Sequence, residues 1–188
     1  KAGLIEDIRI APTALELTYS GPANVSVQIT GIGMTVIVSG VGAENASYEI
    51  PYAHYRTVAE VASALNEITG VNAVVRSASD QKAVDLFANS ESSSLLGTSP
   101  FRLHYIGATT RDYSAEDVRN ALSSMNDVSV KMVGDSKSNS FQIRAGDDGS
   151  DPEASKKIQQ TIASRLSSAF GEDMVAVIKT DFIGSQFS

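Results

Sequence analysis

The chain has 188 residues, a net charge of −7 and 42% apolar residues, enough for one packed domain or two small ones. Its acidic balance argues against nucleic-acid binding, because phosphate neutralisation needs clustered Lys and Arg, and Lys156-Lys157 is the only adjacent basic pair. The chain has no cysteine and no apolar run of ~20 residues, which excludes a disulfide framework, a thiol nucleophile and a membrane-spanning helix within it.

The first part of the chain predicts short strands separated by Gly, Pro and Asn. These strands are expected at residues 3–11, 14–19, 25–30, 34–39 and 47–50. Pro12 ends the first of these strands, and the alternation of the other four, with the turn residues between them, favours an antiparallel meander. Apolar residues at helical spacing then predict a helix over 57–69, with Thr57 as its cap and Gly70 at its end.

The stretch that follows this helix is less regular. A strand is predicted over 71–77, and residues 81–88 fit either a strand or a helix. The Ser-rich segment 89–99 is expected to be a loop or a short turn of helix. Residues 101–106 alternate in polarity and predict another strand.

The second half has clearer boundaries. Ser114 begins a predicted helix with acidic residues in its first turn, where they favour the positive end of the helix dipole. Asp151 and Pro152 are a typical cap and first residue of a second helix, which Gly171 ends. The apolar stripe of this second helix is Ile158, Ile162, Leu166 and Phe170. Strands are predicted over 128–133, 140–145 and 174–182.

The order of elements predicts an α+β fold built from two domains. Without residues 12–100, the chain reads strand, helix, strand, strand, helix, strand, which is the ferredoxin-like order. We therefore expect a ferredoxin-like base domain of residues 1–11 plus 101–188. Residues 12–100 would be an inserted domain of mostly antiparallel strands and one helix.

Two helix-strand segments of the chain, 57–76 and 114–133, also align without gaps at a constant offset. The alignment fits a duplicated unit. It equally fits the generic pattern of any helix and strand that pack on a sheet. Both explanations remain open.

Lys1-Ala2-Gly3 with the strand after it, Ser114 to Leu122, and Thr180 to Gln186 are three short segments that together resemble the SecF family of protein-export membrane proteins. Lys1-Ala2-Gly3 and the strand after it resemble the end of the family's Gly-Ile-Asp-Phe-X-Gly-Gly entry motif. Ser114 to Leu122 resembles its Val-Arg-X-Ala-Leu helix, and Thr180 to Gln186 resembles its Glu-Phe-Val-Gly-Pro-Gln exit motif. Ala2 and Ser185 depart from the family pattern. The Leu-Asp-Leu of the related SecD entry motif is missing, so SecF is the better match.

The resemblance implies a domain between the first two membrane helices of an inner-membrane protein, on the periplasmic side. Such a protein works with SecD beside the SecYEG channel and helps draw unfolded preproteins outward, using the proton gradient. Both ends of the chain are then expected to lie within a longer protein. Proton-carrying residues belong to the membrane helices of the family, so this chain is expected to be no enzyme and to hold no catalytic residues, cofactor or metal.

The residues that could take part in catalysis or bind a ligand also indicate that the chain has no catalytic or metal site. His54 and His104 are the only histidines, and neither has a ligand set in the sequence. The acidic run Asp147 to Asp151 lacks the spacing of a calcium loop and predicts a solvated turn. Gly31-Ile32-Gly33 and Gly40-Val41-Gly42 do not precede a helix as phosphate loops do. The Ser-rich 90–99 has no nucleophile motif.

The sequence is still compatible with one mode of binding, the addition of a strand from another polypeptide. Strand edges within 14–50 are candidates to accept an extended polypeptide as an added strand. The alternative is that these edges are covered or already paired. A second function also remains open, a secreted structural or adhesive module, which the Ser, Thr, Asn and Gly content of 20–50 and 89–99 fits.

Overall fold

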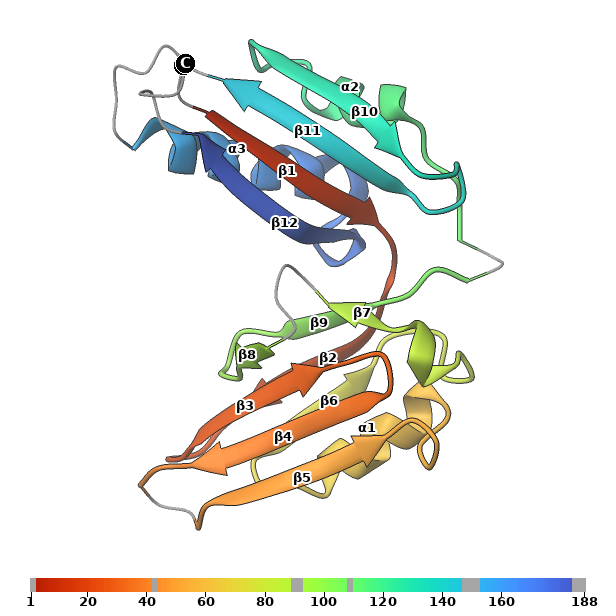
Figure 1. Ribbon diagram of the computed structural model, residues 1–188, viewed down its shortest axis with the longest axis vertical. Helices are drawn as coiled ribbons and strands as arrows, with labels where there is room; N and C mark the ends of the chain where they lie inside the picture. Colours follow the sequence, from red (N-terminus) through yellow and green to blue (C-terminus); the bar gives the residue numbers. More distant parts are fainter. Residues whose placement is uncertain (1–2, 42–43, 89–92, 108–109, 147–152, 184–188) are drawn as a thin grey trace. The chain divides into compact units, whose positions relative to one another are not determined.

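The computed structural model describes residues 3–41, 44–88, 93–107, 110–146 and 153–183. The chain divides into two compact units, residues 1–11 with 108–188 and residues 12–107, here called the split unit and the middle unit (Figure 1). The predicted α+β class is confirmed, since the described residues combine three α-helices with three antiparallel sheets. Residues 101–107 were predicted in the base domain but lie in the middle unit, because β9 (Phe101–His104) pairs with β2 (Thr13–Tyr19).

The split unit is built on one antiparallel sheet with the strand order β10-β11-β1-β12. Its strands are β1 (Gly3–Ile10), β10 (Val128–Val133), β11 (Ser140–Gly146) and β12 (Val175–Ile183). Along the chain they alternate with α2 (Ala115–Ala121) and α3 (Ala154–Phe170), and Figure 1 shows both helices on the same face of the sheet. The first described residue of β1, Gly3, pairs with Ile183 at the end of β12.

The polarity of β1 explains which face of this sheet the helices cover. Leu4, Ile8 and Ile10 are buried and belong to one core with Ile162 and Leu166 of α3. Each buried aliphatic side chain of this kind contributes about 1.5–3 kcal/mol relative to an exposed one. The intervening residues of β1 are partly exposed on the other face.

Local signals at the helix ends agree with the predictions. The Ser114 hydroxyl accepts from the Asp117 amide, and the Asp117 carboxylate accepts from the Ser114 amide, so α2 begins with a complete capping box. Gly171 ends α3 at φ +106°, a conformation that L side chains rarely adopt. The predicted cap Asp151 and Pro152 lie outside the described residues.

The middle unit has two antiparallel sheets, β6-β2-β9-β7 and β5-β4-β3-β8. The strands not yet bounded are β3 (Asn24–Ile29), β4 (Gly33–Ser39), β5 (Ala46–Pro51), β6 (Val71–Val75), β7 (Phe87–Ala88) and β8 (Ser93–Leu95). The predicted meander is therefore limited to β3, β4 and β5, because β2 lies in the other sheet between β6 and β9. Residues 93–95 lie within the segment 89–99 that was predicted as a loop or helical turn, but they form the strand β8 because they pair with β3.

Residues from both sheets and from α1 (Val58–Asn66) form the core of the middle unit. Thr57 caps α1 as predicted, with its side chain accepting from the Glu60 amide. At the other end, the Asn66 side chain donates to the Ala73 carbonyl at 3.0 Å and accepts from the Ala73 amide at 2.8 Å. These two bonds fix the helix against β6. The ambiguous 81–88 contains a short 3₁₀-helix, Ala83–Asp85, followed by β7.

Candidate functional site

The residues predicted to have ordinary structural roles occupy separate elements. Among the described residues, no group of three or more His, Asp or Glu side chains is placed to hold a metal ion. His54 lies exposed in the loop after β5, whereas His104 is buried and stacks on Phe87 with ring centroids 5.8 Å apart. Of the two glycine-rich segments, Gly31 and Ile32 lie in the turn between β3 and β4, and Gly40 and Val41 directly follow β4. The acidic run 147–151 lies outside the described residues.

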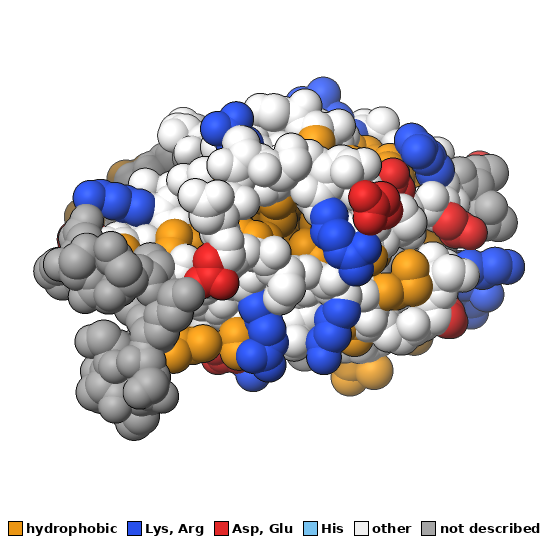
Figure 2. All heavy atoms as spheres, turned by 90° about the horizontal axis from the view of Figure 1, so that it is seen from above, with side chains coloured by type: hydrophobic (Ala, Val, Ile, Leu, Met, Phe, Trp, Pro, Cys, Tyr) orange, Lys and Arg blue, Asp and Glu red, His pale blue; other side chains and the backbone are white. Residues whose placement is uncertain are grey.

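Surface charge is mixed where it can be seen directly. On the face shown in Figure 2, Lys and Arg side chains are interspersed with acidic and hydrophobic ones. The described residues on that face present no continuous basic track of the kind that follows a phosphate backbone.

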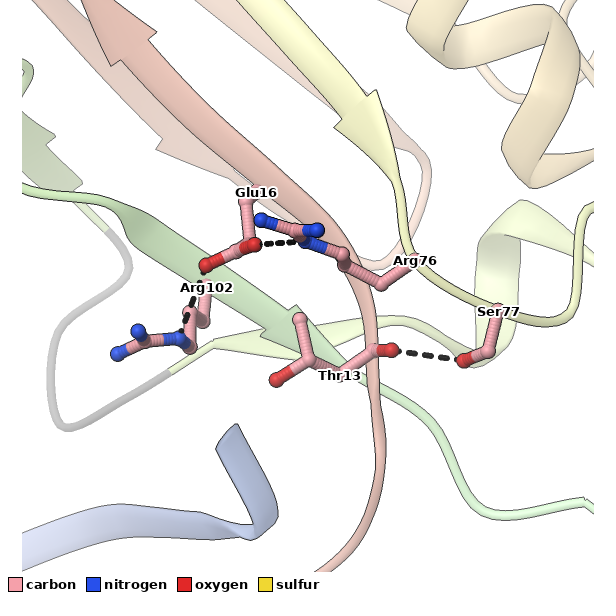
Figure 3. Close-up of polar contacts among 5 residues, drawn as sticks. All are labelled: Thr13, Glu16, Arg76, Ser77 and Arg102. Atoms are coloured by element: carbon pink, nitrogen blue, oxygen red, sulfur yellow. Dashed lines mark hydrogen bonds and ion pairs between the residues drawn. The ribbon is translucent and has the colours of Figure 1, made fainter. Parts of the chain in front are cut away.

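A carboxylate held between two arginines lies on the sheet of β2 (Figure 3). Glu16 of β2 is 7% exposed and accepts from Arg76, and its other oxygen accepts from Arg102 Nε at 3.1 Å. Arg102 is on the neighbouring β9, and Arg76 directly follows β6, the other neighbour. The cluster therefore joins three strands, and we assign it a structural role, because both arginines are engaged by one carboxylate.

A second buried carboxylate lies in the split unit. Glu6 of β1 is 1% exposed and is on the helix-covered face between Leu4 and Ile8. Thr180 of β12 donates to its Oε2 at 2.9 Å. Burial raises the pKa of Glu6, and the hydrogen bond from Thr180 opposes this in part.

Among the strands of residues 13–51, only β5 has an unpaired edge among the described residues. Of the four strands within residues 13–51, β2, β3 and β4 each have a paired strand on both sides. β5 pairs with β4 alone among the described residues, and Figure 1 shows it as the outer strand of its sheet. The register between β4 and β5 runs without a bulge from Val38–Ala46 to Gly33–Pro51. The pairing of β5 with β4 is therefore uninterrupted over six residues.

Backbone geometry identifies the groups that this edge presents. The Tyr52 amide donates to the Ile32 carbonyl at 2.9 Å. In the same register, the backbone groups of the even-numbered residues of β5 bond to β4. In an antiparallel pair the intervening residues direct their N–H and C=O groups to the other side. Ser47 and Glu49 thus present two donors and two acceptors outward. Pro51 ends the edge, because it has no amide N–H and its carbonyl already accepts from the amides of His54 and Tyr55 at 3.1 and 3.0 Å.

The side chains of this edge differ between its two faces. Glu49 accepts from the Thr35 hydroxyl at 2.9 Å and from the Ser47 hydroxyl at 3.5 Å, which holds its carboxylate on one face. Tyr48 is on the core-facing side opposite Val36, yet it is 43% exposed. From Ile10 to Tyr55 the sequence contains three glutamates and neither Lys nor Arg.

A hollow of about 510 Å³ lies near the chain segment that leaves β5. It is formed by the loop after β5 and by the outward face of α1. Its lining residues are His54, Tyr55, Ala59, Glu60, Ser63, Ala64 and Glu67. The hollow is open and carries two carboxylates, so it extends the acidic character of this part of the middle unit.

The sequence predicted β5 as a strand and placed candidate edges within residues 14–50, but it did not identify β5 as the edge or predict the two buried carboxylates. Glu6 shares the parity of Leu4, Ile8 and Ile10 in an alternating strand, and this position was a signal that its side chain would be buried. Glu16 alternates with Leu15 and Leu17, so the pattern alone predicts an exposed side chain. Its burial depends on two arginines that are distant in the sequence.

Comparisons with known proteins agree with the resemblance seen in the sequence. No family model matches the chain, and no solved structure matches it. The chain is 24% identical over 209 residues to protein translocase subunit SecF of Treponema pallidum (strain Nichols). The match covers 100% of this chain and 50% of the relative, so the chain spans about half the length of that protein.

No helix among the described residues is both long and apolar enough to cross a membrane. The comparisons give no support to the alternative of an adhesive module. The match along the whole chain instead confirms the predicted resemblance, and the chain is a SecF-like domain.

Proposed function

We propose that this chain is the extracytoplasmic domain of a SecF-type subunit and that it assists the translocation of unfolded preproteins. The observation that carries this proposal is the similarity to a SecF translocase subunit over the whole chain. The complete protein would lie in the inner membrane with this domain on the periplasmic side. SecD and the SecYEG channel would be its partners, and the proton gradient would drive the cycle.

The split unit would be a ferredoxin-like base next to the membrane. Its element order and its antiparallel strand order β10-β11-β1-β12, with both helices on one face, support this assignment. The middle unit would be a domain inserted after β1. Because Gly3 pairs with Ile183, the strands that would connect to the two membrane helices are neighbours in one sheet. A change in the separation of those helices would act directly on the β1–β12 pair.

Contact with the preprotein would occur at the edge of β5. A translocating polypeptide is extended, so its backbone can bond to the outward N–H and C=O groups of Ser47 and Glu49. Main-chain hydrogen bonds of this kind are independent of side-chain identity, which suits a protein that handles many substrates. The domain would then work by holding and releasing an extended segment, without covalent chemistry.

Site-specific photo-crosslinking to a stalled preprotein tests this contact. A photoreactive residue would replace Ser47 in the complete protein, and the matched control would replace Gln28. Gln28 is exposed in β3 of the same sheet, but β3 is paired on both sides. We expect crosslinks from position 47 and few from position 28. A clean absence of crosslinks from the whole middle unit would refute the contact role.

A further inference from the structure

We infer that the β5 edge selects the segments it accepts, favouring a Lys or Arg opposite Glu49 between apolar neighbours and rejecting acidic segments. This inference rests on the proposed addition of a strand to β5. It names the chemical class of segment that the edge takes.

The added strand is expected to run antiparallel to β5. Every strand pair described in this sheet is antiparallel. Ser47 and Glu49 each direct both backbone groups outward, which is the arrangement of a bonded residue pair in an antiparallel ladder. The guest residue opposite Glu49 would therefore exchange two hydrogen bonds with it. That residue must have an N–H, so it is not proline.

The face that carries Glu49 favours a basic guest side chain. Directly opposed residues have Cβ atoms about 4.5–5.5 Å apart, so the guest side chain opposite Glu49 lies beside its carboxylate. The described contacts of that carboxylate are two hydroxyl donors, and no described cation lies within ion-pair distance of it. A guest Lys or Arg supplies the missing charge, whereas a guest Asp or Glu is repelled.

The opposite face of the β5 edge favours apolar guest side chains. The guest residues on either side of this position share a face with Tyr48 and Ile50. That face continues inward to Val36 and Met34, which are buried in the core of the middle unit. Tyr48 remains 43% exposed because no described strand lies beyond it. Apolar guest side chains at these two positions would cover its ring and extend the core by one strand.

Fluorescence anisotropy with blocked seven-residue peptides tests the inference on the 188-residue chain. The peptides alternate Thr and Val and carry a central Lys, Glu or Thr. We expect the Lys peptide to bind about 3- to 10-fold more tightly than the Glu peptide, from the usual strength of cross-strand charge pairs. E49K should reverse this order. E49Q should remove the difference between Lys and Glu peptides and leave the Thr peptide unchanged.

A peptide N-methylated at the bonding positions separates the selection of charge from the addition of a strand to β5. If N-methylation abolishes binding but the Lys and Glu peptides bind wild-type protein equally, charge selection is refuted and addition of a strand to β5 stands. If no peptide binds, or if N-methylation has no effect, addition to β5 is refuted together with the selection. Circular dichroism verifies the fold of each variant. Should E49K fail to fold, the isosteric E49Q carries the test alone.

Discussion

Glu6→Gln is the substitution that most directly tests the electrostatics of the split unit. Glu6 is 1% exposed beside a core of aliphatic side chains, and the Thr180 hydroxyl donates to its carboxylate at 2.9 Å. The amide of glutamine has nearly the same shape, and its oxygen can accept the same hydrogen bond. The substitution therefore removes the charge and retains the packing.

The size of the effect follows from proton linkage. Because burial raises the pKa of Glu6, the native state keeps its proton at pH values where the unfolded chain has lost it. The stabilisation present below the unfolded pKa, which is near 4.5, is lost as the pH rises towards the folded pKa. In that window one proton changes the free energy of unfolding by about 1.4 kcal/mol per pH unit. Glu6→Gln should remove this slope and be more stable than wild type at pH 7.

Urea unfolding between pH 4.5 and 8 measures the difference between variant and wild type. Hydrogen exchange of the β1 amides identifies the transition that belongs to the split unit. Glu172→Gln, at an exposed position of the same unit, is the matched control and should change stability by less than about 0.5 kcal/mol. A difference between Glu6→Gln and wild type that stays constant over this pH range would refute the reasoning.

Three further substitutions test the middle unit. The Tyr52 hydroxyl is buried and lacks a hydrogen-bond partner among the described residues, and burial raises its pKa to about 12. Tyr52→Phe should therefore raise stability by about 1 kcal/mol in thermal unfolding, and a loss of stability would contradict this account. Thr57→Ala should cost about 1 kcal/mol through the lost cap of α1, with Thr57→Ser restoring it. Leu65→Ala should lower the free energy of unfolding in urea by about 2–5 kcal/mol, because it leaves a cavity in the core. A loss below about 1 kcal/mol would contradict this, since it would mean that neighbouring side chains fill the cavity.

Several elements were readable from local sequence because their signals lie within a few residues. The caps Thr57 and Ser114 each satisfy an amide three positions later, and the apolar stripes of α1 and α3 repeat at helical spacing. The strand alternation of β1, β3, β4 and β5 was equally local. These features predicted the class of fold and the order of elements. Short motifs predicted the resemblance to SecF, which the whole-chain match confirms.

Sheet membership required the tertiary structure, because pairing partners are set by long-range contacts. β2 was predicted in the meander but lies between β6 and β9, and residues 93–95 become a strand only through β3. For the same reason, residues 101–107 fall in the middle unit.

The candidate site shows the same division. The sequence by itself predicted a strand at residues 47–50, in which Glu49 alternates with Tyr48, and it contains no Lys or Arg between Ile10 and Tyr55. It did not determine that β5 is the strand left at the edge, or that a hydrogen bond from Tyr52 to Ile32 directs the groups of Glu49 outward. Those facts depend on which strands occupy the other positions in the sheet. Alternation gives the face of a side chain, whereas only pairing decides which backbone groups remain open.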